Sequence, residues 1–149
     1  MRWHGLPALI VVMLAVANLR GVPDRPSKKK PLRDEERVQG TWISHVQERD
    51  GKKFKASVRL VIQGSRWVLT IDNDISKGTF KLNLAAKLKS FDASVTEGFG
   101  MGIKAVGIYR LEGDRWTICW TVPERNRPTE FKTRPDDNCY LFIFQKTRR

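Results

Sequence analysis

Apolar and polar residues alternate along residues 105–122, on both sides of Gly113-Asp114. This dipeptide is typical of a two-residue hairpin turn, and folding the chain about it pairs the two flanking runs. Directly opposed residues of an antiparallel pair point to the same face of the sheet. One face of the predicted hairpin then carries Gly107, Tyr109, Leu111, Trp116, Ile118 and Trp120. We expect this face to form a wall of the core, with Gly107 leaving room for the indole of Trp120 opposite.

Residues 58–71 repeat this arrangement around a turn at Gly64-Ser65. The opposed apolar pairs are Val58 with Ile71, Leu60 with Leu69, and Ile62 with Trp67. The other strands that alternation predicts lie at residues 40–48, 78–84, 90–97 and 139–146. The last of these strands is apolar on both faces, which predicts that it is covered on both sides.

The segments between the strands predict turns and one long connection. Asp72-Asn73-Asp74 is similar to the start of a calcium loop, but Lys77 stands where such a loop needs glycine, so we interpret it as a turn. Residues 98–102 are a glycine-rich turn that leads into a strand, whereas a nucleotide-binding loop leads into a helix. Residues 123–138 are long for a structureless loop, and we expect an extra short strand near residues 129–133.

About eight strands, with no long helix after residue 38, make this an all-β chain. Short turns favour an antiparallel meander in which consecutive strands are neighbours. Each strand has one apolar face, and closure into a barrel covers that face while it removes the sheet edges. We therefore predict an antiparallel meander of about eight strands closed into a barrel, with a two-sheet sandwich as the alternative.

The residues before the predicted barrel domain, which we place at 38–149, predict a leader and a tether. Residues 1–17 combine a charged start, a short apolar run and the end Ala15-Val16-Ala17, a pattern typical of a secretory signal peptide. An uncleaved anchor or a buried N-terminal segment is the alternative. Residues 18–37 are rich in proline and lysine and predict a flexible basic linker, with one helical turn over residues 32–38. We expect an exported protein, periplasmic or extracellular, with no transmembrane span after cleavage; no cysteine follows the cleavage pattern, so we do not expect a lipoprotein.

The run Gly40-Thr41-Trp42 looks like the G-x-W signature of lipocalin-like barrels, in which the tryptophan closes the barrel base beneath a basic residue from near the chain end. The candidates for that basic residue are Lys146, Arg148 and Arg149. The wider resemblance lies in Asp50-Gly51-Lys52, Leu60–Gly64, Gly78–Leu82, Gly107–Asp114, Ile118-Cys119 and Arg127–Phe131. Over nearly all of residues 38–149 the chain resembles an uncharacterised lipocalin-like domain family expanded in planctomycete bacteria. The resemblance implies a small exported barrel and brings no established activity.

The sequence offers little of the chemistry of an active site. Of the two histidines, His4 lies in the predicted signal peptide and His45 lies on the first strand, on the face opposite Trp42. A single histidine supports neither a metal-ligand cluster nor a catalytic triad. The paired aspartates, Asp72 with Asp74 and Asp136 with Asp137, lie in segments where turn formation explains them. Cys119 and Cys139 lack the spacing of zinc or redox sites, and we expect free thiols, although a disulfide is the open alternative. We therefore expect no enzymatic activity, no cofactor and no metal site.

Aromatic side chains dominate the predicted interior: Trp42, Trp67, Phe80, Phe91, Tyr109, Trp116 and Trp120. If these rings fill the barrel, the protein is an envelope interaction or structural module, and its net charge of +12 favours an anionic envelope component as the partner. If the rings line an open cup, the barrel binds a small hydrophobic ligand. We expect the filled barrel, with the ligand-binding protein as the alternative. Nucleic acid binding needs exposed stacking rings, so we do not expect it.

Overall fold

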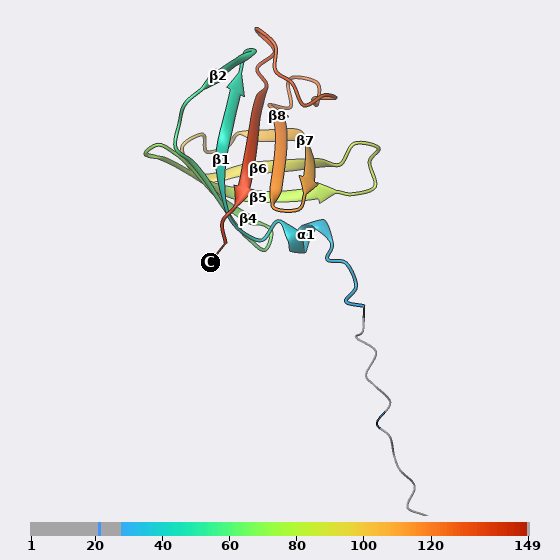
Figure 1. Ribbon diagram of the computed structural model, residues 1–149. Coiled ribbons are helices and arrows are strands. Elements are labelled where there is room, and N and C mark those ends of the chain that lie inside the picture. Colours follow the sequence, from blue (N-terminus) through green and yellow to red (C-terminus); the bar gives the residue numbers. More distant parts are fainter. Residues whose placement is uncertain (1–20, 22–27, 149) are drawn as a thin grey trace, which may run out of the picture. The chain divides into compact units, whose positions relative to one another are not determined.

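In the part of the chain that the structure describes, nine antiparallel strands form one sheet, and its first long strand pairs with its last. The computed structural model describes Gly21 and residues 28–148, so the predicted signal peptide and much of the predicted linker lie outside the described residues. The strands are β1 (Gly40–Arg49), β2 (Lys52–Phe54), β3 (Val58–Gln63), β4 (Arg66–Ile71), β5 (Asp74–Asn83), β6 (Ser90–Gly98), β7 (Lys104–Glu112), β8 (Arg115–Thr121) and β9 (Tyr140–Lys146). Each strand from β3 to β8 pairs with the next one in the chain, and β9 pairs with β1 (Figure 1).

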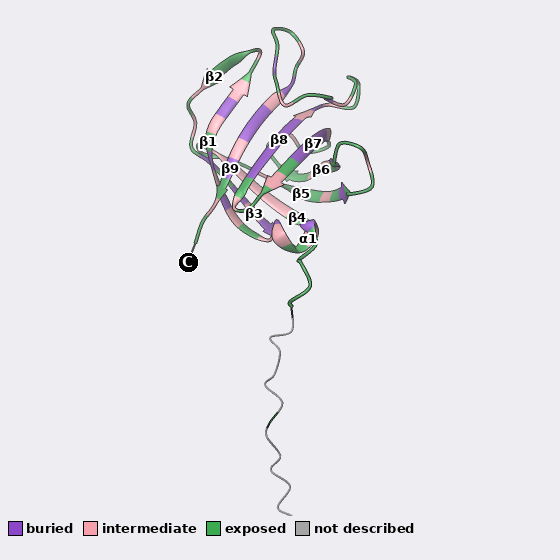
Figure 2. Ribbon diagram, turned by 45° about the vertical axis from the view of Figure 1, so that its right-hand side comes forward, coloured by how far each residue is buried: buried purple, intermediate pink, exposed green. Residues whose placement is uncertain are grey.

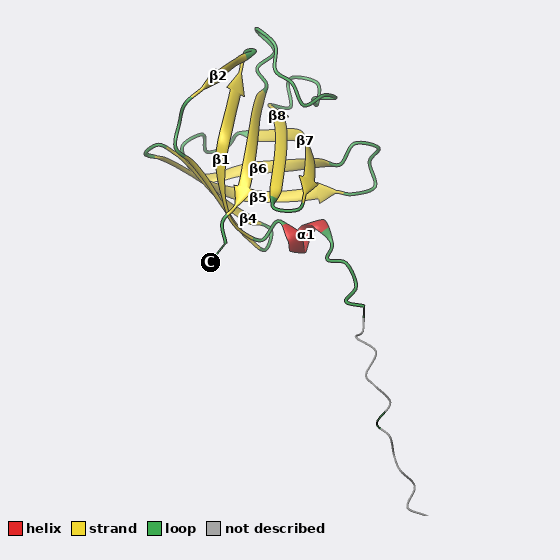
Figure 3. Ribbon diagram, in the orientation of Figure 1, coloured by secondary structure: helices red, strands yellow, loops and turns green. Residues whose placement is uncertain are grey.

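Eight of these strands close a barrel, and the short β2 extends the edge of β1 beyond the end of β3. The predicted antiparallel meander of about eight strands in a closed barrel is therefore confirmed, in place of the two-sheet alternative. Figure 3 shows that strands and their connecting loops make up almost the whole unit, with one short helix. Each of the long strands has an apolar face, and closure of the barrel covers that face while it removes the edges of the sheet.

The two hairpins read from the alternation have the predicted registers. In the β7–β8 pair Gly107 lies opposite Trp120, and in the β3–β4 pair Ile62 lies opposite Trp67. The first turn residues, Gly113 and Gly64, have φ of +57° and +62°. A two-residue turn that matches the twist of the strands needs this left-handed conformation at its first central position, and glycine adopts it without strain.

The space beside Gly107, however, is used by a different side chain from the one expected. A Cβ atom on Gly107 would lie 2.5 Å from the ring of Phe91 and 2.6 Å from the carbonyl oxygen of Cys119. The expectation that Gly107 makes room for Trp120 is therefore wrong. Gly107 admits the ring of Phe91 from the neighbouring strand β6, which pairs with it directly.

One end of the barrel is closed by the helix α1 (Asp34–Arg37), which confirms the helical turn predicted over residues 32–38. Asp34 is buried and accepts hydrogen bonds from Tyr109 at 2.9 Å and from Lys89 at 2.8 Å. Burial raises the pKa of Asp34, but these hydrogen bonds and the charges of Lys89 and Arg37 outweigh it and hold that pKa below its ordinary value. The compact unit begins at Leu32, so the helix belongs to the barrel and not to the linker expected over residues 18–37.

Trp42 forms the centre of this closed end. Its side chain is fully buried, and its indole Nε1 donates a hydrogen bond of 2.8 Å to the carbonyl oxygen of Val38. The ammonium of Lys146 lies 5.3 Å from the centroid of the Trp42 ring and donates to the carbonyl oxygen of Arg37 at 2.8 Å. Of the two candidates that the structure describes, Lys146 covers the tryptophan and Arg148 pairs with Asp114. The third, Arg149, lies outside the described residues.

A second, smaller core lies outside the barrel, against β8 and β9. It consists of Ile108, Cys119, Cys139 and Leu141, with Phe131 packed against them. The connection between β8 and β9 thus covers part of the apolar outer face of the last strand. Figure 2 shows β8 mostly buried and β9 as a mixture of buried and half-buried residues.

The short strand expected near residues 129–133 is absent from this connection, so that prediction is wrong. Side chains fix the segment instead. The Thr133 hydroxyl donates to Glu48 at 2.7 Å and accepts from the backbone N–H of Gly51 at 2.9 Å.

Candidate ligand-binding cavity

The barrel interior holds a cavity of about 970 Å³. Its walls come from the inward faces of the strands, and its rim comes from loops at the end opposite α1, around Asp50, Gly100 and Asp136. The expectation that side chains fill the barrel is therefore wrong. Small residues at inward positions of β6 and β7, Ala93 and Ala105, face each other across the pair and leave room that larger side chains would fill.

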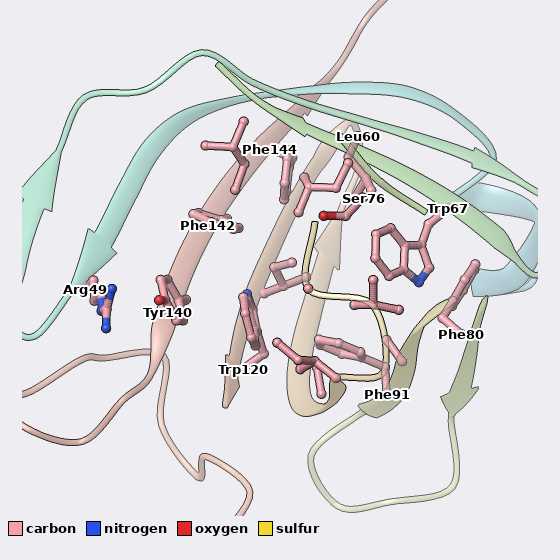
Figure 4. A pocket seen from close by; sticks show the side chains of 18 of the residues that line it. Arg49, Leu60, Trp67, Ser76, Phe80, Phe91, Trp120, Tyr140, Phe142 and Phe144 are labelled. Atoms are coloured by element: carbon pink, nitrogen blue, oxygen red, sulfur yellow. The ribbon is translucent and has the colours of Figure 1, made fainter. Parts of the chain in front are cut away.

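Five of the seven aromatic residues predicted for the interior line the cavity: Trp67, Phe80, Phe91, Trp116 and Trp120. Figure 4 labels all of these except Trp116. The other two, Trp42 and Tyr109, also point inward, but they are buried in the closed end beneath the cavity and do not line it. Leu60, Leu69, Ile118 and Phe142 add further apolar surface to the wall.

The floor of the cavity is an aromatic cluster centred on Trp116. Its ring meets Trp42 edge-on at a centroid distance of 5.3 Å, and Phe144 lies 6.4 Å from it on the neighbouring strand. The Trp116 side chain is only 4% exposed, and its indole nitrogen has no hydrogen-bond partner among the described residues. The floor is therefore close-packed, and the open space lies above it.

The upper wall is built from rings that are only partly covered. Trp120 stacks on Tyr140 with a centroid distance of 4.6 Å and an interplanar angle of 13°, across the β8–β9 pair. Arg127, from the connection between β8 and β9, braces the adjacent wall, because its guanidinium donates to the carbonyl oxygens of Phe91 at 2.7 Å and Gly107 at 2.9 Å. This brace fixes the pair of strands that carries Phe91 against the cavity. Sequence reasoning did not single out Arg127 except within the segment of the family resemblance.

The rim has polar and apolar parts. Arg49, Lys52 and Lys53 reach it from the β1–β2 corner. On the β6–β7 side, the glycine-rich turn presents Phe99, which is 70% exposed and lines the cavity mouth. An apolar molecule that approaches this end therefore meets an exposed ring before it reaches the aromatic wall.

Sequence reasoning missed Arg49 because of a β-bulge. Strict alternation from Trp42 would place Arg49 on the outer face, but the pairing of β1 with β9 shifts register between Ser44 and Val46. A bulge inserts one residue and exchanges the two faces beyond it. Beyond the bulge Arg49 faces Tyr140 and lines the interior.

Groups with catalytic or metal-binding chemistry lie elsewhere. His45 is exposed on the outer face of β1, and Asp72 lies in the turn before β5. Across residues 28–148, no cluster of three or more histidine, cysteine or acidic side chains has the geometry to hold a metal ion, and no helix there has the length and hydropathy of a membrane span.

Both cysteines are free thiols, as expected, and both are buried in the outer core. Burial, and then the neighbouring Cys139, raise the pKa of the Cys119 thiol to about 12. A thiol with so high a pKa is almost entirely protonated near neutral pH, so it is a poor nucleophile.

No protein-family model, curated protein or solved structure matches this chain. The resemblance to lipocalin-like domains therefore rests on the sequence segments named above. The closed antiparallel barrel, with its buried tryptophan beneath Lys146, is consistent with such a fold.

Proposed function

We propose that the protein is a non-enzymatic barrel that binds a small hydrophobic ligand in its interior. The cavity of about 970 Å³ is the observation that carries the proposal. Cavities that hold small molecules have volumes of roughly 300–1,000 Å³ and mostly apolar walls with a few polar groups. The barrel interior has this size and this lining, so the alternative function from the sequence is favoured over the filled envelope module.

The partly exposed rings support the same proposal. Trp67, Phe80, Phe91 and Trp120 all retain exposed surface in the cavity, whereas the rings of the floor are buried. A ligand that covers this surface gains about 25 cal/mol for each Å² of apolar area removed from water. Export through the predicted signal peptide, and delivery of such a ligand outside the cytoplasm, belong to the same proposal.

The envelope module has no comparable observation in its favour. Several basic side chains on the outer surface are already paired with neighbouring carboxylates, among them Arg110 with Glu112 and Arg134 with Glu130. Such exposed pairs lower the positive potential around these side chains, and the net charge of +12 alone does not identify an anionic partner.

Titration of the purified full chain with N-phenyl-1-naphthylamine, an uncharged apolar fluorophore, tests the proposal. We expect saturable binding, with displacement of the fluorophore by an uncharged ten-carbon alcohol. Ala93→Phe adds a ring to the inward face of β6 and should weaken binding at least about tenfold, because it occupies the space that the ligand needs.

Thr96→Phe is the control on the same strand, since Thr96 is exposed and does not line the cavity. Equal binding by the wild type and both variants would place the fluorophore outside the barrel and overturn the proposal.

A further inference from the structure

Among the described residues, the cations that line the cavity come from one place, the β1–β2 corner of the rim. Arg49 and Lys52 are directly opposed in the β1–β2 register, so both side chains lie on the same face. That face is the inward one, because Phe54, two residues from Lys52, packs edge-on against Phe142 in the wall. Both cations line the cavity.

Arg49 is held in place mainly by aromatic packing. Its guanidinium carbon lies 4.9 Å from the centroid of the Tyr140 ring, and Tyr140 in turn stacks on Trp120. Figure 4 shows Arg49 beside Tyr140 at one end of the row of rings that crosses the pocket. Stacking on an aromatic face orients the planar guanidinium and leaves the N–H groups at its edge available.

These N–H groups have little to bind within the protein. The one ionic contact of Arg49 among the described residues joins its Nε to Asp50 at 3.5 Å, and both side chains are nearly half exposed. Lys52 pairs with Arg49 through its backbone, but its side chain has no hydrogen bond or ion pair within residues 28–148. Two cations, one of them oriented by an aromatic ring, thus lie together at the mouth of an apolar cavity with donor groups available.

We propose that the ligand is an amphiphile whose anionic head binds Arg49 and Lys52 while its apolar chain lies in the cavity along Trp120. This inference rests on the proposed function and names its ligand class. The shared head chemistry is a carboxylate or a phosphate, both of which accept two parallel hydrogen bonds from a guanidinium. Asp50 and Asp136 also lie at the rim, where their carboxylates repel an anion. The gain in affinity therefore requires a head group that accepts hydrogen bonds directly from the Arg49 guanidinium.

Competition against N-phenyl-1-naphthylamine distinguishes the contribution of the head group to affinity from that of the alkyl chain. The competitors share a ten-carbon chain and carry a carboxylate, a phosphate, a hydroxyl or an ammonium. We expect decanoate or decyl phosphate to displace the fluorophore at concentrations about tenfold lower than decanol, and decylamine to be the weakest. Whichever of decanoate and decyl phosphate binds more tightly shows whether the head group of the ligand is a carboxylate or a phosphate. The advantage of the anions should shrink at high salt, because the site is open to solvent.

Arg49→Gln should abolish the advantage of the anions and leave the affinity for decanol unchanged. Arg59→Gln is the matched control, because Arg59 is exposed on the opposite face of the wall and does not line the cavity. Equal displacement by decanoate and decanol in the wild type, or an anion preference that survives Arg49→Gln with Lys52→Gln, would overturn the inference while the proposed function stands. Failure of the fluorophore and of decanol to bind would refute the proposed function itself.

Discussion

Replacing Gly107 by alanine tests how closely β6 and β7 approach in the wall of the cavity. The new methyl group would lie 2.6 Å from the carbonyl oxygen of Cys119, which belongs to the backbone, and 2.5 Å from the Phe91 ring. Overpacking of this kind costs about 1–3 kcal/mol, because the backbone or the ring has to move. Alanine restricts the unfolded chain more than glycine, which offsets about 0.5–1 kcal/mol of this cost. We expect the free energy of unfolding to fall by about 1–2 kcal/mol.

Urea unfolding of the full chain, followed by tryptophan emission, measures this loss. Gly21→Ala is the control, since a Cβ atom at that position meets nothing within 4 Å. A double-mutant cycle then identifies the obstructing ring. Gly107→Ala should cost less in a Phe91→Leu background than in the wild type, whereas Trp120→Leu should act additively. An unchanged midpoint for Gly107→Ala, or coupling to Trp120 without coupling to Phe91, would refute the packing described for this wall.

Two further predictions concern the closed end of the barrel. In the same urea assay, Trp42→Phe should destabilise the protein by about 1–3 kcal/mol more than Trp116→Phe. Of these two indoles only that of Trp42 donates a buried hydrogen bond, and its loss would leave the carbonyl oxygen of Val38 without this donor. Equal losses would contradict the stabilising role of this hydrogen bond. Asp34→Asn should lower the free energy of unfolding by about 1–3 kcal/mol at pH 7. The pKa of Asp34 is lowered in the fold, so this carboxyl stabilises the protein only while it is ionised, and the difference from the wild type should close as the pH falls below about 4. A difference that is constant between pH 7 and pH 3 would contradict this prediction.

The period-two pattern was sufficient for most of the fold. In a half-buried strand the faces alternate at every residue, so the pairs Gly107–Trp120 and Ile62–Trp67 follow from the position of each turn alone. The pattern no longer predicts which face a residue lies on where an irregularity interrupts the alternation. The bulge after Ser44 reversed the faces of β1, and it brings Arg49, which lies beyond the strand predicted over residues 40–48, to the cavity rim.

The chain's long connection and its cavity were harder to predict for a different reason. Thr133 is fixed by side-chain hydrogen bonds to partners about 85 residues away in the chain, a contact that no local pattern encodes. Whether rings fill a barrel depends on how the inward residues of all eight strands combine at each level. The sequence indicated which aromatic residues point inward, but it did not indicate that Ala93 and Ala105 lie directly opposite each other beside them.

The distribution of burial explains how the barrel tolerates so large an open interior. Fully buried rings and hydrogen-bonded polar groups are concentrated at the closed end, where Trp42, Tyr109 and Asp34 form one connected cluster. The outer core around Cys119 adds a second region of dense packing against β8 and β9. Dense packing is concentrated in these two regions, so Trp120, which stacks on Tyr140, keeps part of its surface available to a ligand. A ligand present at 100 times its dissociation constant would then add about 2.7 kcal/mol to stability, and that gain would arise mainly in the part of the barrel that is least well packed without it.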